Sequence, residues 1–173
     1  MNAIQWPPAH HPTRTKVFVS NVITIPAPAV RIWSWLIRAQ EWPEWYSNAS
    51  NVYFLSGAGP DLYGGARFRW KTFGARITST VREFRPYSRL GWDAKGIGIN
   101  AYHAWLLEQR ADGTTRVLME ETQKGWLARL RKLLMPDRMH RFHQLWLESL
   151  SEKALLGFPS FPSEIEPAAQ RLK

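Results

Sequence analysis

The chain has 173 residues, enough for one domain of ordinary size. It contains no cysteine, which excludes disulfide bonds, thiolate catalysis and cysteine-ligated metals. Its formal net charge of +9 favours anionic partners such as nucleic acid, anionic lipid or an acidic ligand, and its ten tryptophans are generous for a core of this size.

Residues 1–15 are rich in proline and lack the apolar run of a signal peptide, so they are expected to form an irregular lead-in. The longest apolar stretch, residues 32–37, is too short to cross a bilayer. We therefore predict a soluble, cytoplasmic protein.

The next part of the chain predicts one strand and two short helices. Residues 16–25 alternate and are rich in β-branched side chains, which is typical of a strand. Pro26 and Pro28 end this strand, and residues 29–38 carry apolar side chains at helical spacing. Residues 41–46 (EWPEWY) predict a second helix of about one turn.

The middle of the chain predicts an antiparallel meander, because short strands with tight turns between them pair with their neighbours in sequence. Turns rich in Gly or Pro separate most of the strands. The predicted strands cover residues 51–55, 66–73, 76–84, 89–94, 99–109 and 115–123.

The last third changes to helical periodicity. Residues 126–134 predict one helix, and a longer one is predicted from Asp137 to about Leu156, with Pro136 between them. Its apolar positions recur at spacings of three and four, at Met139, Phe142, Trp146 and Leu150. This long helix alone could cover the apolar face of a curved sheet.

Six short motifs carry a resemblance to a known superfamily. They are residues 25–28 (IPAP), 30–33 (VRIW), 41–46 (EWPEWY), 63–70 (YGGARFRW), 103–105 (HAW) and 115–125. Their order resembles the SRPBCC superfamily, which includes START lipid-transfer domains and polyketide cyclases, and the resemblance extends over residues 16–156. It implies an α+β, helix-grip (START-like) fold: about seven antiparallel strands curved around the long C-terminal helix, with two short helices after the first strand.

The same resemblance implies a function and a domain organisation. Members usually hold a hydrophobic ligand between sheet and helix, although their activities diverge. We predict a ligand-binding domain at residues 16–157, between the lead-in and a Pro-rich tail at residues 158–173. The ligand expected is a hydrophobic or aromatic small molecule, such as a lipid or a polyketide-like compound, which the protein binds and transports without a cofactor.

The last predicted hairpin places a histidine opposite a carboxylate. If residues 111–113 form its loop, three cross-strand pairs share one face: Leu107 with Val117, Trp105 with Met119, and His103 with Glu121. A carboxylate can orient an imidazole as a general acid or base. A polyketide cyclase or dehydratase that uses His103 and Glu121 is therefore the alternative function, while a structural ion pair would also explain the two residues.

The tryptophans favour a cavity over a completely filled core. Six of them are expected to point inward, and six indoles between a concave sheet and one helix are hard to pack without leaving space. The ligand-binding residues predicted on this basis are Trp33, Trp45, Phe68, Trp70, Trp92, His103, Trp105, Met119, Glu121, Trp126, Leu130, Met139, Phe142 and Trp146. The segment between Trp126 and Pro136 is a candidate gate.

Two stretches are strongly basic. Residues 66–89 hold seven basic side chains and one acidic one, and residues 124–141 hold six and one. A solvated outer face explains this pattern, and docking to an anionic membrane is the second alternative function. Nucleic acid is not favoured, because no recognised binding motif accompanies the charge.

No metal or nucleotide site is predicted. His140 and His143 lie three residues apart on the long helix, with only Asp137 nearby, and are interpreted as surface histidines. A glycine-rich phosphate-binding loop is absent. The strand at residues 51–55 is expected to expose an edge through which subunits could pair, so an oligomer stays open.

Overall fold

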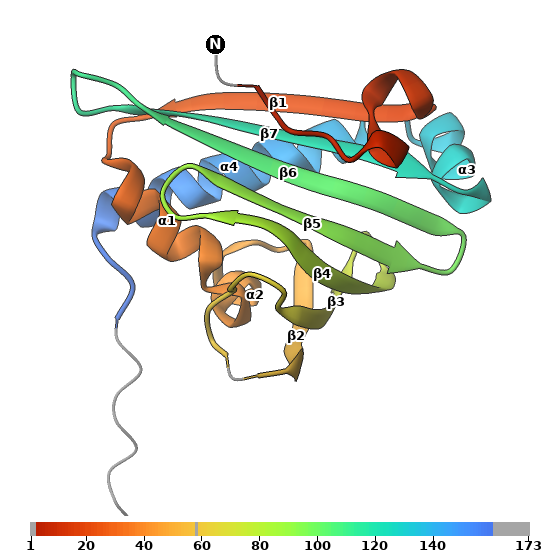
Figure 1. Ribbon diagram of the computed structural model, residues 1–173, viewed down its shortest axis with the longest axis horizontal. Coiled ribbons are helices and arrows are strands. Elements are labelled where there is room, and N and C mark those ends of the chain that lie inside the picture. The colour runs from red at the N-terminus through yellow and green to blue at the C-terminus, as the bar shows by residue number, and fades with distance from the viewer. Residues whose placement is uncertain (1–2, 58, 161–173) are drawn as a thin grey trace, which may run out of the picture.

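One curved antiparallel sheet wraps around the long C-terminal helix (Figure 1). The computed structural model describes residues 3–57 and 59–160, and within them the sheet has seven strands in the order β1-β7-β6-β5-β4-β3-β2. The strands are β1 (Val17–Ile25), β2 (Ala49–Ser56), β3 (Arg67–Thr72), β4 (Ala75–Arg85), β5 (Arg89–Gly96), β6 (Ile99–Gln109) and β7 (Thr115–Lys124). The meander expected for the middle of the chain is confirmed.

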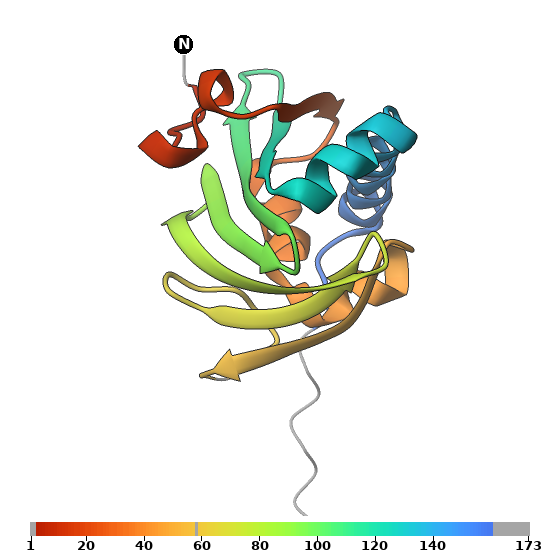
Figure 2. The ribbon, with the colours of Figure 1, turned by 90° about the vertical axis from the view of Figure 1, so that its right-hand side faces the viewer.

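The helices lie on the concave side of the sheet and along its ends. Two of them, α1 (Ala29–Ile37) and α2 (Trp42–Trp45), connect β1 to β2, with the short 3-10 helix η3 (Ala39–Glu41) between them. The others are α3 (Trp126–Leu134) and α4 (Arg138–Leu156). Seen from the end, the sheet curves around the space that α4 fills (Figure 2).

The element bounds follow the sequence patterns closely. Pro28 precedes α1 and Gly157 follows α4, so both helices begin and end at the residues that local chemistry favours. No predicted strand or helix differs from the observed one by more than two residues at either end. Among the described residues, no helix has the length and apolar character that a membrane span requires.

Irregular pairing helps the sheet to curve. Register shifts occur between Ser50 and Tyr53 in the β2–β3 ladder and between Val81 and Glu83 in the β4–β5 ladder. An extra residue on one strand of an antiparallel pair bends that strand and increases its twist. The strands β2 to β5 can therefore turn toward the helices.

The lead-in is more ordered than its composition indicates. It forms two 3-10 turns, η1 (Pro8–His10) and η2 (Pro12–Arg14), and lies on the outer face of the sheet. Trp6 packs edge-on against Tyr102 at a centroid distance of 5.9 Å, and the Thr122 hydroxyl donates to the carbonyl of His10. Residues 101–107 of β6 are buried on both faces of the sheet.

At the other end, the predicted tail is described only as far as Ser160. The indole of Trp35 donates to the carbonyl of Gly157 at 2.8 Å, which ties the end of α4 to α1. Residues 161–173 lie outside the described residues, so the expectation for the rest of the tail stays a prediction.

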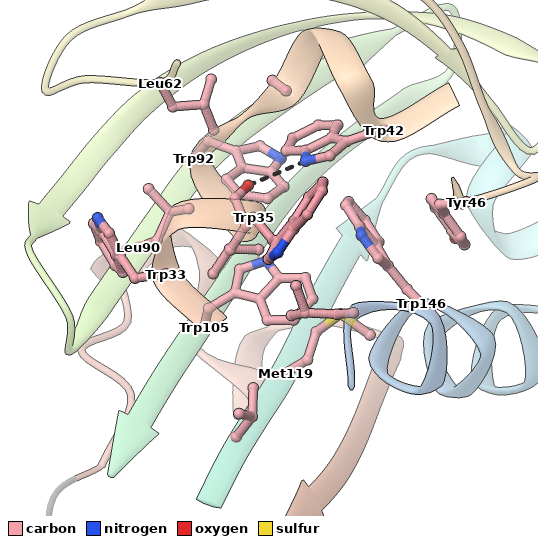
Figure 3. Close-up of a cluster of buried hydrophobic side chains, with 14 of the residues drawn as sticks. Trp33, Trp35, Trp42, Tyr46, Leu62, Leu90, Trp92, Trp105, Met119 and Trp146 are labelled. Carbon is pink, nitrogen blue, oxygen red and sulfur yellow. Dashed lines mark hydrogen bonds between the residues drawn. The ribbon is translucent and has the colours of Figure 1, made fainter. Parts of the chain in front are cut away.

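The core between sheet and helices contains a cluster of aromatic rings (Figure 3), and Trp42 contacts four of them. Its indole N–H donates to the carbonyl of Leu36 at 3.0 Å, and its ring contacts Trp146 edge-on at 5.1 Å. On the other side of Trp146, Tyr46 stacks at 4.4 Å. Most of the tryptophans therefore pack against other aromatic rings, and less space remains between them than their number indicated.

Candidate functional site

The predicted pairing of His103 with Glu121 is confirmed. The two residues are cross-strand partners in the β6–β7 ladder, as are the other two pairs expected from the loop at residues 111–113. This register depends on a tight loop, in which Gly113 has a φ of +84° and the amide of Arg110 donates to the carbonyl of Thr114. A loop one residue longer or shorter would turn Glu121 to the outer face.

A third residue, His143 of α4, completes the cluster, although its position there was not predicted from the sequence. Its interpretation as a surface histidine is wrong, because only 1% of His143 is exposed. The face of α4 that packs on the sheet contains His143, Trp146, Leu147, Leu150 and Ala154. The spacing of His143 from Trp146 and Leu147, three and four residues, was the signal available in the sequence.

The three side chains meet at one carboxylate oxygen. Oε2 of Glu121 lies 3.0 Å from Nδ1 of His103 and 3.1 Å from Nε2 of His143. Its other oxygen, Oε1, accepts a hydrogen bond of 2.6 Å from the side-chain amide of Gln123. Two strands and the helix that crosses them thus fix the position of a single buried carboxylate.

Burial and hydrogen bonding set the charge of this cluster. Burial alone would raise the pKa of the Glu121 carboxyl, but the imidazoles of His103 and His143 outweigh it and hold the pKa below its usual range. Burial lowers the pKa of His103, and the hydrogen bond to Glu121 only partly offsets this effect. At neutral pH the site contains an ionised carboxylate and a neutral His103, whose Nδ1–H donates to it.

Aromatic rings enclose the imidazole of His103. Trp92 stacks on it at a centroid distance of 4.7 Å and Trp105 at 5.5 Å, while Trp146 meets it edge-on at 5.4 Å. These rings shield His103, which is 2% exposed, from bulk solvent and fix the plane of its imidazole. Its Nε2 has no hydrogen-bond partner among the described residues.

A cavity of about 70 Å³ opens beside the cluster. The sheet forms one wall, α4 the second, and the segment from Arg131 to Met139 the third. Two of the lining indoles, those of Trp92 and Trp146, carry buried N–H groups with no hydrogen-bond partner in the described part of the chain. Leaving such a group unsatisfied costs about 1–3 kcal/mol, so the cavity offers polar groups to a ligand inside apolar walls.

Six of the residues predicted to bind a ligand line this cavity: Trp70, Trp92, His103, Glu121, Met139 and Trp146. Four others, Trp33, Phe68, Trp105 and Met119, are buried in the core instead of along the cavity. Trp45 and Phe142 are half-buried outside it. The lining also includes residues that were not predicted, among them Phe73, Ile77, Ala101, Gln123 and His143.

The expectation that Trp126 and Leu130 point inward is wrong. Trp126 is 63% exposed and Leu130 is exposed as well, while Ala128 is the residue of α3 that is buried. The reason is that α4 already covers the concave face of the sheet, so α3 lies at its end (Figure 2). The apolar stripe of α3 is consequently directed toward solvent.

A sheet that grips a long C-terminal helix, with a cavity between them, defines a START-like, helix-grip protein. Residues 16–154 match the family described as polyketide cyclase / dehydrase and lipid transport. The chain belongs to this family, and the superfamily inferred from its motifs is confirmed.

Solved structures agree with this assignment. A hypothetical protein from Helicobacter pylori is 30% identical, with a TM-score of 0.82, over 89% of this chain and 97% of its own. An aromatase/cyclase from Streptomyces sp. R1128 is 12% identical with a TM-score of 0.69, over 83% of this chain and 99% of its own, and shows the fold alone. A START superfamily protein from Mycobacterium smegmatis is similar at the same level, with 12% identity and a TM-score of 0.64, over 80% of this chain and 97% of its own. No curated protein matches the chain.

Proposed function

We propose that the protein binds and transports a hydrophobic or aromatic small molecule that carries a polar oxygen. The observation that supports this proposal is the mixed lining of the cavity: apolar side chains such as Ile77, Ile99 and Met139 surround the unpartnered donors of Trp92 and Trp146. Ligand sites commonly combine apolar walls with a few placed polar groups. An indole N–H donates to an oxygen, so the ligand should present one to it.

Loading requires the cavity to open, because its volume of about 70 Å³ is small. Small-molecule sites commonly measure roughly 300–1,000 Å³. The third wall is the part that can move, since Pro136 interrupts the helical hydrogen bonding between α3 and α4. Arg131, Met135 and Pro136 line the cavity from this segment, which supports the candidate gate.

The first test is native mass spectrometry of the purified protein, followed by organic extraction and identification of what is released. We expect a bound hydrophobic molecule in the wild type and none in Ala101→Phe, because Ala101 lines the cavity and a phenyl ring would fill it. Ala111→Phe is the matched control, since Ala111 lies in an exposed loop and should leave binding unchanged.

The melting temperature of Ala101→Phe shows whether this variant has folded. If it has not, Ala94→Leu makes the same test with a smaller increase in side-chain volume. A wild type that carries no adduct and ignores a panel of lipids and aromatic polyketides would contradict the proposal. Binding by Ala101→Phe that equals binding by the wild type would show that the ligand binds outside this cavity.

The cyclase or dehydratase alternative uses the same cavity. His103 and Glu121 line it, so a bound polyketide would lie next to a neutral imidazole held by a carboxylate. His103→Ala separates the two functions. If His103 acts as a general acid or base on the bound molecule, the variant loses turnover but still binds the ligand.

The exposed side of α3 favours a further candidate function, docking to an anionic membrane. Its apolar residues Leu133 and Leu134 are 79% and 65% exposed, and they directly follow Arg129, Arg131 and Lys132 in the sequence. A short helix with apolar residues and flanking basic ones is typical of a segment that lies in the interface of an anionic membrane. Docking there would place the gate of the cavity at the lipid surface.

Sedimentation with vesicles tests this docking. We expect binding to phosphatidylcholine vesicles that contain phosphatidylglycerol, weakening as salt is added, and little binding to phosphatidylcholine alone. Lys132→Ala should weaken binding roughly fivefold, as expected for about 1 kcal/mol per basic residue, and Leu133→Ser should weaken it as well.

Leu156→Ser is the control for the apolar change. Leu156 is 81% exposed, but it ends α4, a helix of 19 residues, so it lies about 28 Å from the gate. Equal loss in both serine variants, or binding that does not depend on phosphatidylglycerol, would rule out docking through α3.

A further inference from the structure

We propose that His103, Glu121 and His143 form a binding site for one divalent transition-metal ion at the wall of the cavity. The sequence pattern indicated no metal site, because His143 was interpreted as a surface residue. The inference goes beyond the proposed binding of a small molecule and does not depend on it, since a metal could bind here whether or not the cavity holds an organic ligand.

The geometry of the cluster fits three ligands of one ion. One nitrogen from each imidazole and one carboxylate oxygen lie within 4.8 Å of one another, and all three residues are buried. The two shortest separations, from Oε2 of Glu121 to Nδ1 of His103 and to Nε2 of His143, are 3.0 and 3.1 Å. Ligand atoms about 2.1 Å from an ion are about 3.0 Å apart at right angles and about 3.4 Å apart in a tetrahedron, so the two imidazole nitrogens, which lie within 4.8 Å of each other, would move together around the ion.

A second observation points to a ligand at the same place. Neither ring nitrogen of His143 has a hydrogen-bond partner in the described part of the chain, although only 1% of this residue is exposed to solvent. Its Nε2 lies close to Glu121, but the ring is not directed at that oxygen as a hydrogen-bond donor would be. Buried polar groups in proteins are almost always satisfied, so the two nitrogens of His143 leave a place for a ligand.

The surroundings of the carboxylate support the same interpretation. Gln123 donates to Oε1 of Glu121 and thereby leaves Oε2 to face the two imidazoles. Second contacts of this kind orient the ligands of metal sites.

The donor set selects the class of metal. Two imidazoles and one carboxylate suit zinc, cobalt and iron(II), whereas calcium and magnesium prefer oxygen ligands. Three protein ligands leave at least one coordination position, and all three residues line the cavity. That position is available to water or to an oxygen of a bound molecule. The indole N–H groups of the cavity would also donate to such an oxygen.

The test uses the full chain, freed of metal with a chelator and titrated with Co²⁺ and, separately, Zn²⁺. We expect one ion per chain, visible absorption bands from bound Co²⁺, and a rise in melting temperature when Zn²⁺ is added. Glu121→Gln and His143→Ala should each weaken binding at least about 100-fold, and Gln123→Ala should weaken it about 10- to 100-fold, because it removes only the orienting contact.

His140→Ala is the matched control, because His140 is exposed on the same helix three residues from His143 and should bind metal as the wild type does. If Glu121→Gln does not fold, His143→Asn replaces it, since it keeps a polar group of similar size in the same cavity wall. Absence of the Co²⁺ bands, or binding that survives in His143→Ala and disappears in a His10→Ala, His11→Ala variant, would overturn the proposal. Ligand extraction is a separate measurement, so failure of either proposal can be recognised independently.

Discussion

Trp146→Ala is expected to lower the free energy of unfolding by about 3–5 kcal/mol, the usual cost of deleting a buried large aromatic side chain. Trp146 is 1% exposed, and its ring stacks on Tyr46 and meets Trp42 and Trp105 edge-on. Removing the indole takes away its contacts with six aromatic rings and leaves a void that rigid rings cannot fill. Equilibrium unfolding in urea measures the change.

Trp126→Ala is the control for this loss. Its indole is 63% exposed, so the same substitution there should change the free energy of unfolding by no more than about 0.5 kcal/mol. A domain of this kind has roughly 5–15 kcal/mol of stability in total, which makes the Trp146 variant marginal. Equal effects of the two substitutions would contradict the burial of Trp146 among the aromatic rings of the core.

Gly125→Ala is expected to cost about 2–4 kcal/mol, because it combines backbone strain with a direct clash. Gly125 lies between β7 and α3 and has a φ of +108°, in the region that favours glycine. A Cβ at this position would overlap the carbonyl oxygen of Gly98, which belongs to the turn between β5 and β6 and accepts a hydrogen bond from Leu127. The variant must therefore displace the start of α3 or the turn.

Gly113→Ala separates the two contributions. Its φ is +84°, but a Cβ there would meet nothing within 4 Å, so only the backbone strain of about 1 kcal/mol is expected. Urea unfolding of both variants gives the difference, which reports the clash alone. Amide exchange across residues 126–136 should also become faster in Gly125→Ala, and unchanged exchange would show that this glycine does not hold α3 in place.

The sheet and its register could be predicted because local signals determine them. The loop at residues 111–113 sets the pairing of β6 with β7, and alternation along both strands then assigns each side chain to a face. Two of the three residues of the cluster, His103 and Glu121, followed from this one hairpin. Pro26, Pro28 and Gly157 similarly mark element ends where no tertiary contact needs to be known.

The remaining features depend on how the elements pack on one another, which periodicity does not report. The rotation of α4 about its axis decides whether His143 faces the sheet or solvent, and its burial was recognised only in the structure. In the same way, α3 has a clear apolar stripe, but the place it would occupy is already taken by α4. The volume of the cavity depends on how the rings around Trp42 fit together, so the sequence could indicate its walls but not its size.

The position of β1 at the edge next to β7 has a consequence for folding during synthesis. Ser20 and Glu120 are hydrogen-bonded partners 100 residues apart, so the first strand of the domain must wait for its neighbour until most of the chain has been made. Contacts between such distant segments slow folding. Meanwhile the alternating apolar face of β1, including Val17 and Val19, remains uncovered, and the nascent chain needs to be kept from aggregation until β7 and α4 emerge from the ribosome.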